Sequence, residues 1–246
     1  MLTVLTGDLL AERIGEGEPR VVALHGWGRS GADFVTPLAG LDALALHLPG
    51  FGATAPPPEV WGTPEYAAHV AAALTEVGPT VLVGHSFGGR VAVRLAATHP
   101  ELVRALVLTG VPLVRATAAP KPSARLRAAK WLVARRLAPA ALVERARRGA
   151  GSEDYRAAEG VLRGVLVRTV GEDYREDLAR VAAAGLPVRM IWGEADDAAP
   201  LAGARLAAAL VPQAVLDVVP GAGHLLTGEV ARRVRAHLDE VLEEIG

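Results

Sequence analysis

The sequence predicts an α/β protein with a mostly parallel sheet and helices packed on both of its faces. Short runs rich in Val and Leu recur along the chain and are bounded by Gly or Pro, and helix-compatible stretches lie between them. Such runs are typical of strands buried on both faces. Their alternation with helices favours parallel connections. At 246 residues, the chain is long enough for one large domain.

Each expected element follows from this pattern. The apolar runs predict strands at 21–24, 44–48, 80–83, 103–108, 188–192 and 214–219. The stretches between them predict helices at 64–76, 88–98, 201–210 and 229–245. Residues 1–14 are expected to form an antiparallel hairpin at the edge of the sheet, with Gly7-Asp8 as its turn.

One region interrupts the alternation. Residues 113–178 show no strand signal, and Ala, Arg and Leu recur there at helical spacings. We therefore expect a helical insertion at 113–178 in a core formed by 1–112 and 179–246. Residues 111–175 hold fourteen Lys and Arg against six Asp and Glu, so this stretch carries +8 and the rest must carry −9 to give the total of −1.

Composition excludes several classes of protein. The absence of cysteine rules out disulfides, thiolate metal sites and a cysteine nucleophile. A net charge of −1 gives no reason to expect nucleic acid as a partner. The first residues do not resemble a signal peptide, and no run of about 18 apolar residues predicts a membrane span. We therefore expect a cytoplasmic protein without membrane association.

The strongest chemical signal is Gly84-His85-Ser86-Phe87-Gly88, which follows one predicted strand and precedes a predicted helix. This G-x-S-x-G pattern is typical of a nucleophile elbow, a sharp turn that lifts the serine hydroxyl above the carboxyl edge of the sheet. Open α/β sheets bind their ligands at that edge. Ser86 is therefore the candidate nucleophile. His85 is expected to point off the other side of the turn and to pack in the interior.

A serine needs a base, and the base needs a carboxylate. His224 follows the last predicted strand and therefore lies at the same edge as Ser86. Three acids follow the penultimate strand, namely Glu194, Asp196 and Asp197. Spacing favours Asp196, and the chain order Ser, Asp, His fits this kind of fold. The expected catalytic residues are Ser86, Asp196 and His224.

Attack on a carbonyl builds an oxyanion that needs donors already in place. One candidate is the backbone amide of Phe87, which follows the nucleophile. The second is the amide of Trp27 in the loop His25-Gly26-Trp27-Gly28, where glycines let the backbone approach a ligand. His25 and Gly26 of this loop are candidates for substrate contact. Trp131 in the insertion is another. This chemistry requires no metal and no cofactor.

Together these motifs resemble the α/β-hydrolase superfamily over almost the whole chain. His25 to Gly28 look like its oxyanion loop, Leu48 to Gly52 like its second glycine turn, and Pro220 to His224 like its histidine loop. The resemblance implies an eight-stranded sheet with the second strand antiparallel and a helical cap over the site, here 113–178. His47 and Thr54 depart from the usual Asp and Ser around the second glycine turn.

Within the superfamily, the chain is most similar to small cap-bearing carboxylesterases, including the pimeloyl-carrier methyl esterases. This resemblance implies hydrolysis of an ester or thioester through an acyl-enzyme on Ser86. The chain also resembles a menaquinone-pathway synthase that uses the same triad as a base without a cofactor. That enzyme has an Arg four residues after its serine, which makes Arg90 a candidate for substrate binding. A ligand receptor without catalysis is the third reading.

The basic insertion has two interpretations. Its arginines either cover apolar surface with their long stems and face solvent, or attract an anionic substrate or an acidic acyl-carrier protein. The sequence alone does not name the acyl group or the leaving group, because a fold of this kind hosts many chemistries.

Overall fold

The computed structural model describes residues 1–116, 124–139, 141–143 and 153–246. Within these residues, the strands form one eight-stranded sheet in the order β1-β2-β4-β3-β5-β6-β7-β8. The strands are β1 (Leu2–Val4), β2 (Leu10–Ile14), β3 (Val21–Leu24), β4 (Ala43–His47), β5 (Thr80–His85), β6 (Val103–Thr109), β7 (Val188–Gly193) and β8 (Ala214–Val219).

The pairing of the strands confirms the predicted mostly parallel sheet. Strands β4, β3, β5, β6, β7 and β8 are parallel to their neighbours within this group. Strand β2 runs antiparallel to both β1 and β4. The hairpin of β1 and β2 turns at Gly7, whose φ of 65° suits a glycine, in the predicted place.

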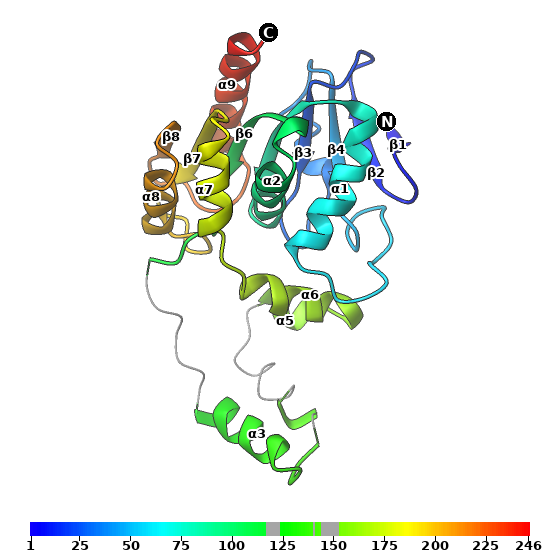
Figure 1. Ribbon diagram of the computed structural model, residues 1–246, viewed down its shortest axis with the longest axis vertical. Coiled ribbons are helices and arrows are strands. Elements are labelled where there is room, and N and C mark those ends of the chain that lie inside the picture. Colours follow the sequence, from blue (N-terminus) through cyan, green and yellow to red (C-terminus); the bar gives the residue numbers. More distant parts are fainter. Residues whose placement is uncertain (117–123, 140, 144–152) are drawn as a thin grey trace.

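Helices cover both faces of the sheet (Figure 1). Helices α1, α2, α7 and α8 share one apolar core with the sheet, and helix α9 and the 3-10 turn η1 share another on the opposite face. The helices are α1 (Thr63–Val77), α2 (Phe87–Thr98), α3 (Ala124–Ala134), α5 (Glu153–Ala157), α6 (Gly160–Val170), α7 (Arg175–Ala183), α8 (Leu201–Ala209) and α9 (Gly228–Glu244); the 3-10 turns are η1 (Gly31–Phe34) and η2 (Pro100–Leu102).

The two cores explain why the sequences of the central strands are unbroken apolar runs. Successive side chains of a strand point to opposite faces of the sheet. In β3, Val22 and Leu24 enter the core under α1 and α2, whereas Val21 and Ala23 enter the core under α9. Both faces are covered, so both sets must be apolar.

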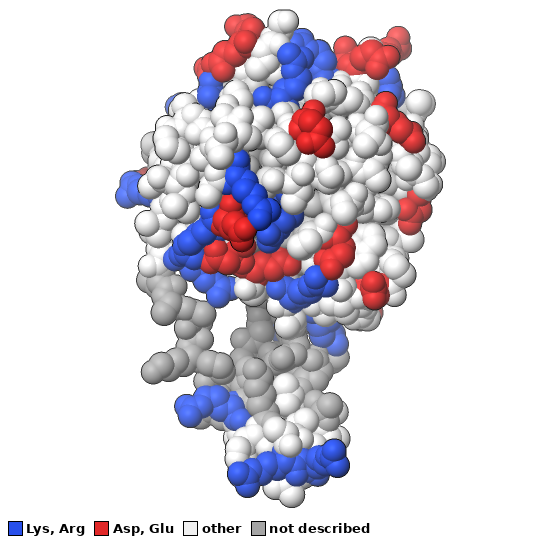
Figure 2. Space-filling model, viewed as in Figure 1, with Lys and Arg blue, Asp and Glu red and all other residues white. Residues whose placement is uncertain are grey.

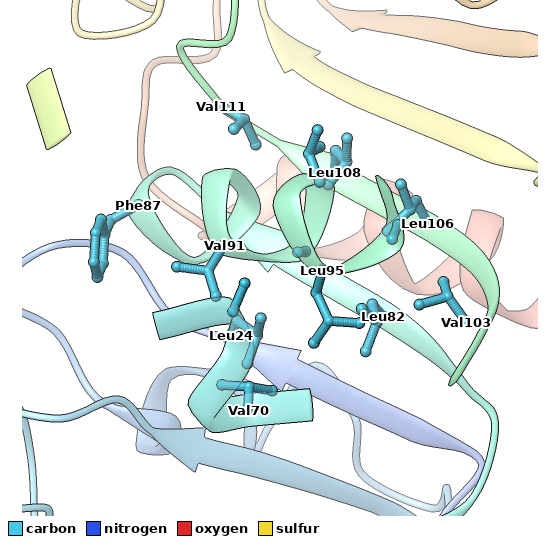
Figure 3. Packing of buried hydrophobic residues seen from close by; sticks show 14 of the residues in the cluster. Leu24, Val70, Leu82, Phe87, Val91, Leu95, Val103, Leu106, Leu108 and Val111 are labelled. Atoms are coloured by element: carbon cyan, nitrogen blue, oxygen red, sulfur yellow. The ribbon is translucent and has the colours of Figure 1, made fainter. Parts of the chain in front are cut away.

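Helix α2 lies at the centre of the larger core and begins within the nucleophile motif, directly after Ser86. Phe87, Val91 and Leu95 repeat at a spacing of four residues and therefore share one side of the helix. Figure 3 shows Val91 and Leu95 directed at Leu24 of β3 and Leu82 of β5. All four of these aliphatic side chains are fully buried. This packing holds the start of α2, and with it the motif, against the sheet.

After β6, the described residues before α7 include the helices α3, α5 and α6, with non-helical segments between them, and no strand. Helices α5 and α6 lie below the sheet edge, and α3 lies farther from the core (Figure 1). The expected end of the insertion at residue 178 falls inside α7, which packs on α2 through an ion pair of 2.7 Å between Arg94 and the buried Asp177. None of the helices in the described ranges has the length and apolar character of a membrane span.

Two arginines, Arg90 in the core and Arg115 at the start of the insertion, hold the end of α6. Arg90 on α2 donates from Nη1 to the carbonyl oxygen of Thr169 at 3.0 Å. Arg115, which follows β6, donates from Nη2 to the carbonyl of Val170. The last carbonyls of a helix lack partners within the helix and carry partial negative charge, so cations stabilise them. These two bonds fix α6 beside the carboxyl edge of the sheet.

Candidate active site

Ser86 occupies the turn between β5 and α2 with φ 51° and ψ −112°. Non-glycine residues rarely adopt a positive φ, and a strained backbone of this kind costs about 1–3 kcal/mol. A Cβ on Gly84 would collide with Gly89, and one on Gly88 would collide with the carbonyl of Leu24. The two glycines therefore allow α2 to pass this close to β5 and β3. The turn has the geometry that the G-x-S-x-G pattern predicts.

The structure brings Ser86, His224 and Asp196 together in one row. Oγ of Ser86 lies 3.0 Å from Nε2 of His224. Nδ1 of His224 lies 2.8 Å and 3.0 Å from the two carboxylate oxygens of Asp196. The carboxylate accepts hydrogen bonds, so Nδ1 carries the proton and Nε2 presents its lone pair to the hydroxyl of Ser86.

Of the three candidate acids, Asp196 is the one that contacts His224. Asp196 is buried, whereas Glu194 and Asp197 are exposed. The amide of Ala199 donates to Oδ1 of Asp196 at 2.7 Å, which fixes the carboxylate in place. Glu194 instead accepts from the amide of Gly221 at 3.1 Å and braces the loop that carries His224.

The loop that holds Trp27 lies against the nucleophile turn. The amide of Gly88 donates to the carbonyl of His25 at 2.9 Å, which joins the two segments. The indole of Trp27 meets Phe51 and Phe87 edge to face, with ring centroids 4.9 Å and 5.4 Å apart. In the part of the chain that the structure describes, the amides of Trp27 and Phe87 donate to no protein acceptor.

A cavity of about 360 Å³ opens above Ser86. The core supplies most of its lining, and helix α6 with Asp154 of α5 supplies the rest. The lining residues are Gly26, Trp27, Arg29, His85, Ser86, Phe87, Arg90, Pro112, Asp154, Leu166, Thr169, Val170, Ala198, His224 and Leu225. A second cavity, which also borders Trp27 and Asp154, is lined by Phe51 and Leu162. The two cavities therefore share Trp27 and Asp154 as wall residues.

Four residues were candidates for substrate contact, and the structure brings two of them to the cavity. Gly26 and Arg90 line it. Arg90 already donates to the end of α6, and its buried Nε has no hydrogen-bond partner among the described residues. Trp131 lies on α3, away from the core, with 51% of its surface exposed and Arg135 stacked on its ring. It does not reach the cavity, because α3 does not pack over the site.

His25 is also absent from the cavity lining. It is fully buried, its Nδ1 lies 2.7 Å from the carbonyl of Gly26, and its Nε2 accepts from the amide of Leu48 at 3.0 Å. Both ring nitrogens are thus used to brace the oxyanion loop against the second glycine turn. Burial lowers the pKa of His25 from 6.5 to about 4, so the ring is neutral.

The expectation that His85 points away from the site is wrong. His85 is buried, as expected, but it lines the cavity, and its Nε2 lies 2.9 Å from the carbonyl oxygen of His224. Motif spacing could not show this contact, because His224 follows 139 residues later along the chain. One signal in the sequence could have indicated this contact: His85 ends the central strand β5, at the same sheet edge to which His224 belongs.

In residues 1–116, 124–139, 141–143 and 153–246, no three His, Asp or Glu side chains gather as a metal site would require.

A serine, an imidazole and a buried carboxylate in one row at the carboxyl edge of such a sheet are the arrangement typical of an α/β hydrolase. The chain belongs to the alpha/beta hydrolase family, whose model matches residues 21–237.

Several relatives resemble this chain over different lengths. It is 32% identical to a pimeloyl-[acyl-carrier protein] methyl ester esterase of Chromobacterium violaceum, over 88% of this chain and 91% of that protein. It is 40% identical to the esterase Rv0045c of Mycobacterium tuberculosis, but the match spans 44% of this chain and only 38% of that protein. The crystal structure of a thermophilic esterase has a TM-score of 0.69 at 28% identity, covering 97% of this chain and 93% of that one.

The choice of acid can be tested with a matched pair of neighbouring residues. In Asp196→Asn, the amide no longer fixes the Nδ1–H tautomer of His224, so we expect kcat for an ester substrate to fall by roughly 10³–10⁴-fold. Asp197→Asn removes an exposed carboxylate next to it and should leave kcat within about twofold, because exposed charges interact weakly. Equal losses in steady-state kinetics would contradict the assignment.

Burial of His25 also predicts how stability depends on pH. The unfolded chain binds a proton at this residue near pH 6.5, whereas the folded protein binds it only near pH 4. Acidification through this window therefore favours unfolding, with a slope of up to about 1.4 kcal/mol per pH unit from one histidine. Urea titrations at several pH values should show a shallower slope for His25→Gln than for the wild type. Identical slopes would contradict the prediction.

Proposed function

We propose that the protein hydrolyses a carboxylic ester or thioester through an acyl-enzyme on Ser86. The observation that carries the proposal is the hydrogen-bonded row from Ser86 through His224 to Asp196, which opens into a cavity. Relatives named as esterases support the same class of reaction. Core and insertion, divided as the sequence suggests at 113–178, both contribute to this cavity.

The proposed first half-reaction transfers the acyl group to the serine. Oγ of Ser86 attacks the carbonyl carbon while its proton moves to Nε2 of His224. Asp196 stabilises the imidazolium that forms. The negative charge on the former carbonyl oxygen is accepted by the amides of Trp27 and Phe87, each of which contributes about 10²–10³-fold to the rate in well-ordered sites of this kind. Collapse of the intermediate expels the alcohol or thiol, which takes the proton from His224.

The second half-reaction restores the enzyme. A water molecule attacks the carbonyl carbon of the acyl group on Ser86, and His224 takes a proton from this water. The intermediate collapses, Oγ of Ser86 takes the proton back, and the carboxylic acid leaves. Every proton transfer passes through Nε2 of His224, which lies within hydrogen-bonding distance of Ser86. No metal or cofactor takes part in these steps.

Substitution of the nucleophile tests this proposal. In Ser86→Ala, the acyl-enzyme cannot form, so kcat/KM for short p-nitrophenyl esters should fall by roughly 10⁴-fold or more. Ser30→Ala is a matched control, because this serine caps η1 without a side-chain hydrogen bond and lies outside the cavity lining.

Mass spectrometry after mixing with ester should find the acyl group on Ser86. Unchanged turnover in Ser86→Ala would overturn the proposal. A fluorophosphonate adduct on Ser86 without any acyl-enzyme from esters would instead favour a cofactor-free lyase or synthase that uses His224 as its base.

We also propose that the ester is presented on an anionic carrier, such as an acidic acyl-carrier protein. The exposed Arg127, Arg135 and Arg136 lie in and just after α3, and Figure 2 shows basic side chains gathered at that end of the molecule. Complementary charge speeds the encounter of two proteins and loses this effect as salt screens it.

Charge reversal separates steering from hydrolysis. Replacing Arg127, Arg135 and Arg136 by Glu should lower kcat/KM for an acyl-carrier methyl ester by roughly tenfold at low salt. The same variant should hydrolyse a free methyl ester at the wild-type rate. A matched control variant replaces three exposed arginines of the core by Glu, namely Arg180, Arg205 and Arg232. Equal effects of the two variants, or no salt dependence with the carrier substrate, would contradict the carrier proposal.

A further inference from the structure

His85 links the nucleophile turn to the loop that carries the base. It is the last residue of β5, immediately before Ser86, and only 3% of its surface is exposed. Its Nε2 lies 2.9 Å from the carbonyl oxygen of His224, and its ring lies beside that of His224 with centroids 5.0 Å apart. A carbonyl only accepts, so Nε2 of His85 must carry the proton and donate.

The loop of His224 packs on the core under α9 through Ala222 and Leu226, and its backbone lies close to Gly193, but its other residues are exposed or half-buried. It spans residues 220–227 between β8 and α9. A Cβ on Gly221 or Gly223 would meet no atom within 4 Å, and Leu225 is 55% exposed. Before His224, hydrogen bonds join Ala222 and Gly221 to the loop after β7. In the described part of the chain, the hydrogen bond that ties the backbone of His224 itself to the sheet comes from His85.

The other edge of the His85 ring lies against the oxyanion loop. A Cβ built on Gly26 would stand 2.8 Å from Nδ1 of His85, so only a glycine leaves room for the ring there. His85 thus lies between Gly26, which precedes the proposed oxyanion donor Trp27, and His224, the proposed base. One buried ring sets the spacing of these two segments around Ser86.

The charge state of His85 suits this arrangement. Burial is the largest cause that lowers the pKa of His85 from 6.5 to about 4. The hydrogen bond to the carbonyl of His224 and the charges of Asp33 and Asp196 raise this pKa, and the imidazole of His224 lowers it, but burial outweighs them. The ring is therefore neutral near pH 7. It donates to the carbonyl of His224 without placing a second positive charge beside the imidazolium that forms during the reaction.

We propose that His85 is a positioning residue, which holds the backbone of His224 through Nε2–H so that the imidazole of His224 stays aligned between Ser86 and Asp196. It touches the loops on both sides of the reacting atoms and takes no proton from the substrate. This inference rests on the proposed function of Ser86 and His224. It adds a role for His85 in aligning His224, which motif spacing does not reveal.

Two amide substitutions isolate the donor. His85→Gln places an amide N–H near the position of Nε2, whereas His85→Asn carries the same group one methylene short, near the position of Nδ1. We expect kcat of His85→Asn to fall by roughly 10²-fold with little change in KM, because a small displacement of a catalytic group is costly. His85→Gln should retain kcat within about tenfold of the wild type. His99→Gln is a control, because His99 is a half-buried histidine that follows the end of α2 and lies outside the cavity lining.

A second readout needs no substrate. The Nδ1–H proton of His224, shared with Asp196, should give a far-downfield resonance in the wild type and in His85→Gln. The resonance should broaden or disappear in His85→Asn, because His224 is no longer held. The rate of fluorophosphonate labelling at Ser86 should follow the same order.

The outcomes separate this inference from the proposed function. If folded His85→Asn matches the wild type in kcat, labelling rate and downfield resonance, His85 does not position His224. If both variants lose activity equally while thermal unfolding shows both folded, the ring acts by shape and the donor is irrelevant. If the wild type hydrolyses no ester, the proposed function fails, but the resonance and the labelling rate still decide whether His85 holds His224.

Discussion

The strained backbone of Ser86 is the constraint on which the rest of the site depends. A positive φ at this residue turns the chain from β5 into α2 within one residue, and it directs consecutive side chains to different parts of the site. His85 reaches the loop of His224, Ser86 faces the cavity, and Phe87 packs on Trp27. Packing of α2 into the larger core supplies the free energy that offsets the strain.

Buried histidines in this molecule differ in role because their partners differ. Nδ1 is the donor in His25, where Nε2 accepts from an amide. Nε2 is the donor in His85, where it meets a carbonyl. In His224, Nδ1–H faces a carboxylate and Nε2 is left to accept from the hydroxyl of Ser86. The backbone and carboxylate groups around each ring, rather than the residue type, decide which nitrogen is available for chemistry.

Much of the fold follows from local patterns, because the parallel strands are short apolar runs that lead into Gly or Pro, and α1, α2 and α8 each lie between two of them. The positions of Ser86, His224 and Asp196 also follow, since parallel strands bring their carboxyl ends to one edge. Contacts with distant segments could not be read from the chain. The roles of His25 and His85 depend on the amide of Leu48 and the carbonyl of His224, and the place of Trp131 depends on how far α3 lies from the core.

The manner in which α6 is held has a consequence for how the cavity can diversify. Arg90 and Arg115 bind the carbonyl oxygens of Thr169 and Val170, which belong to the backbone and are present whatever side chains the helix carries. Replacement of Leu166 or Val170 can therefore reshape the wall above Ser86 while the helix keeps its attachment. Selection for a new acyl group can act on α6 without first having to rebuild its junction with the sheet.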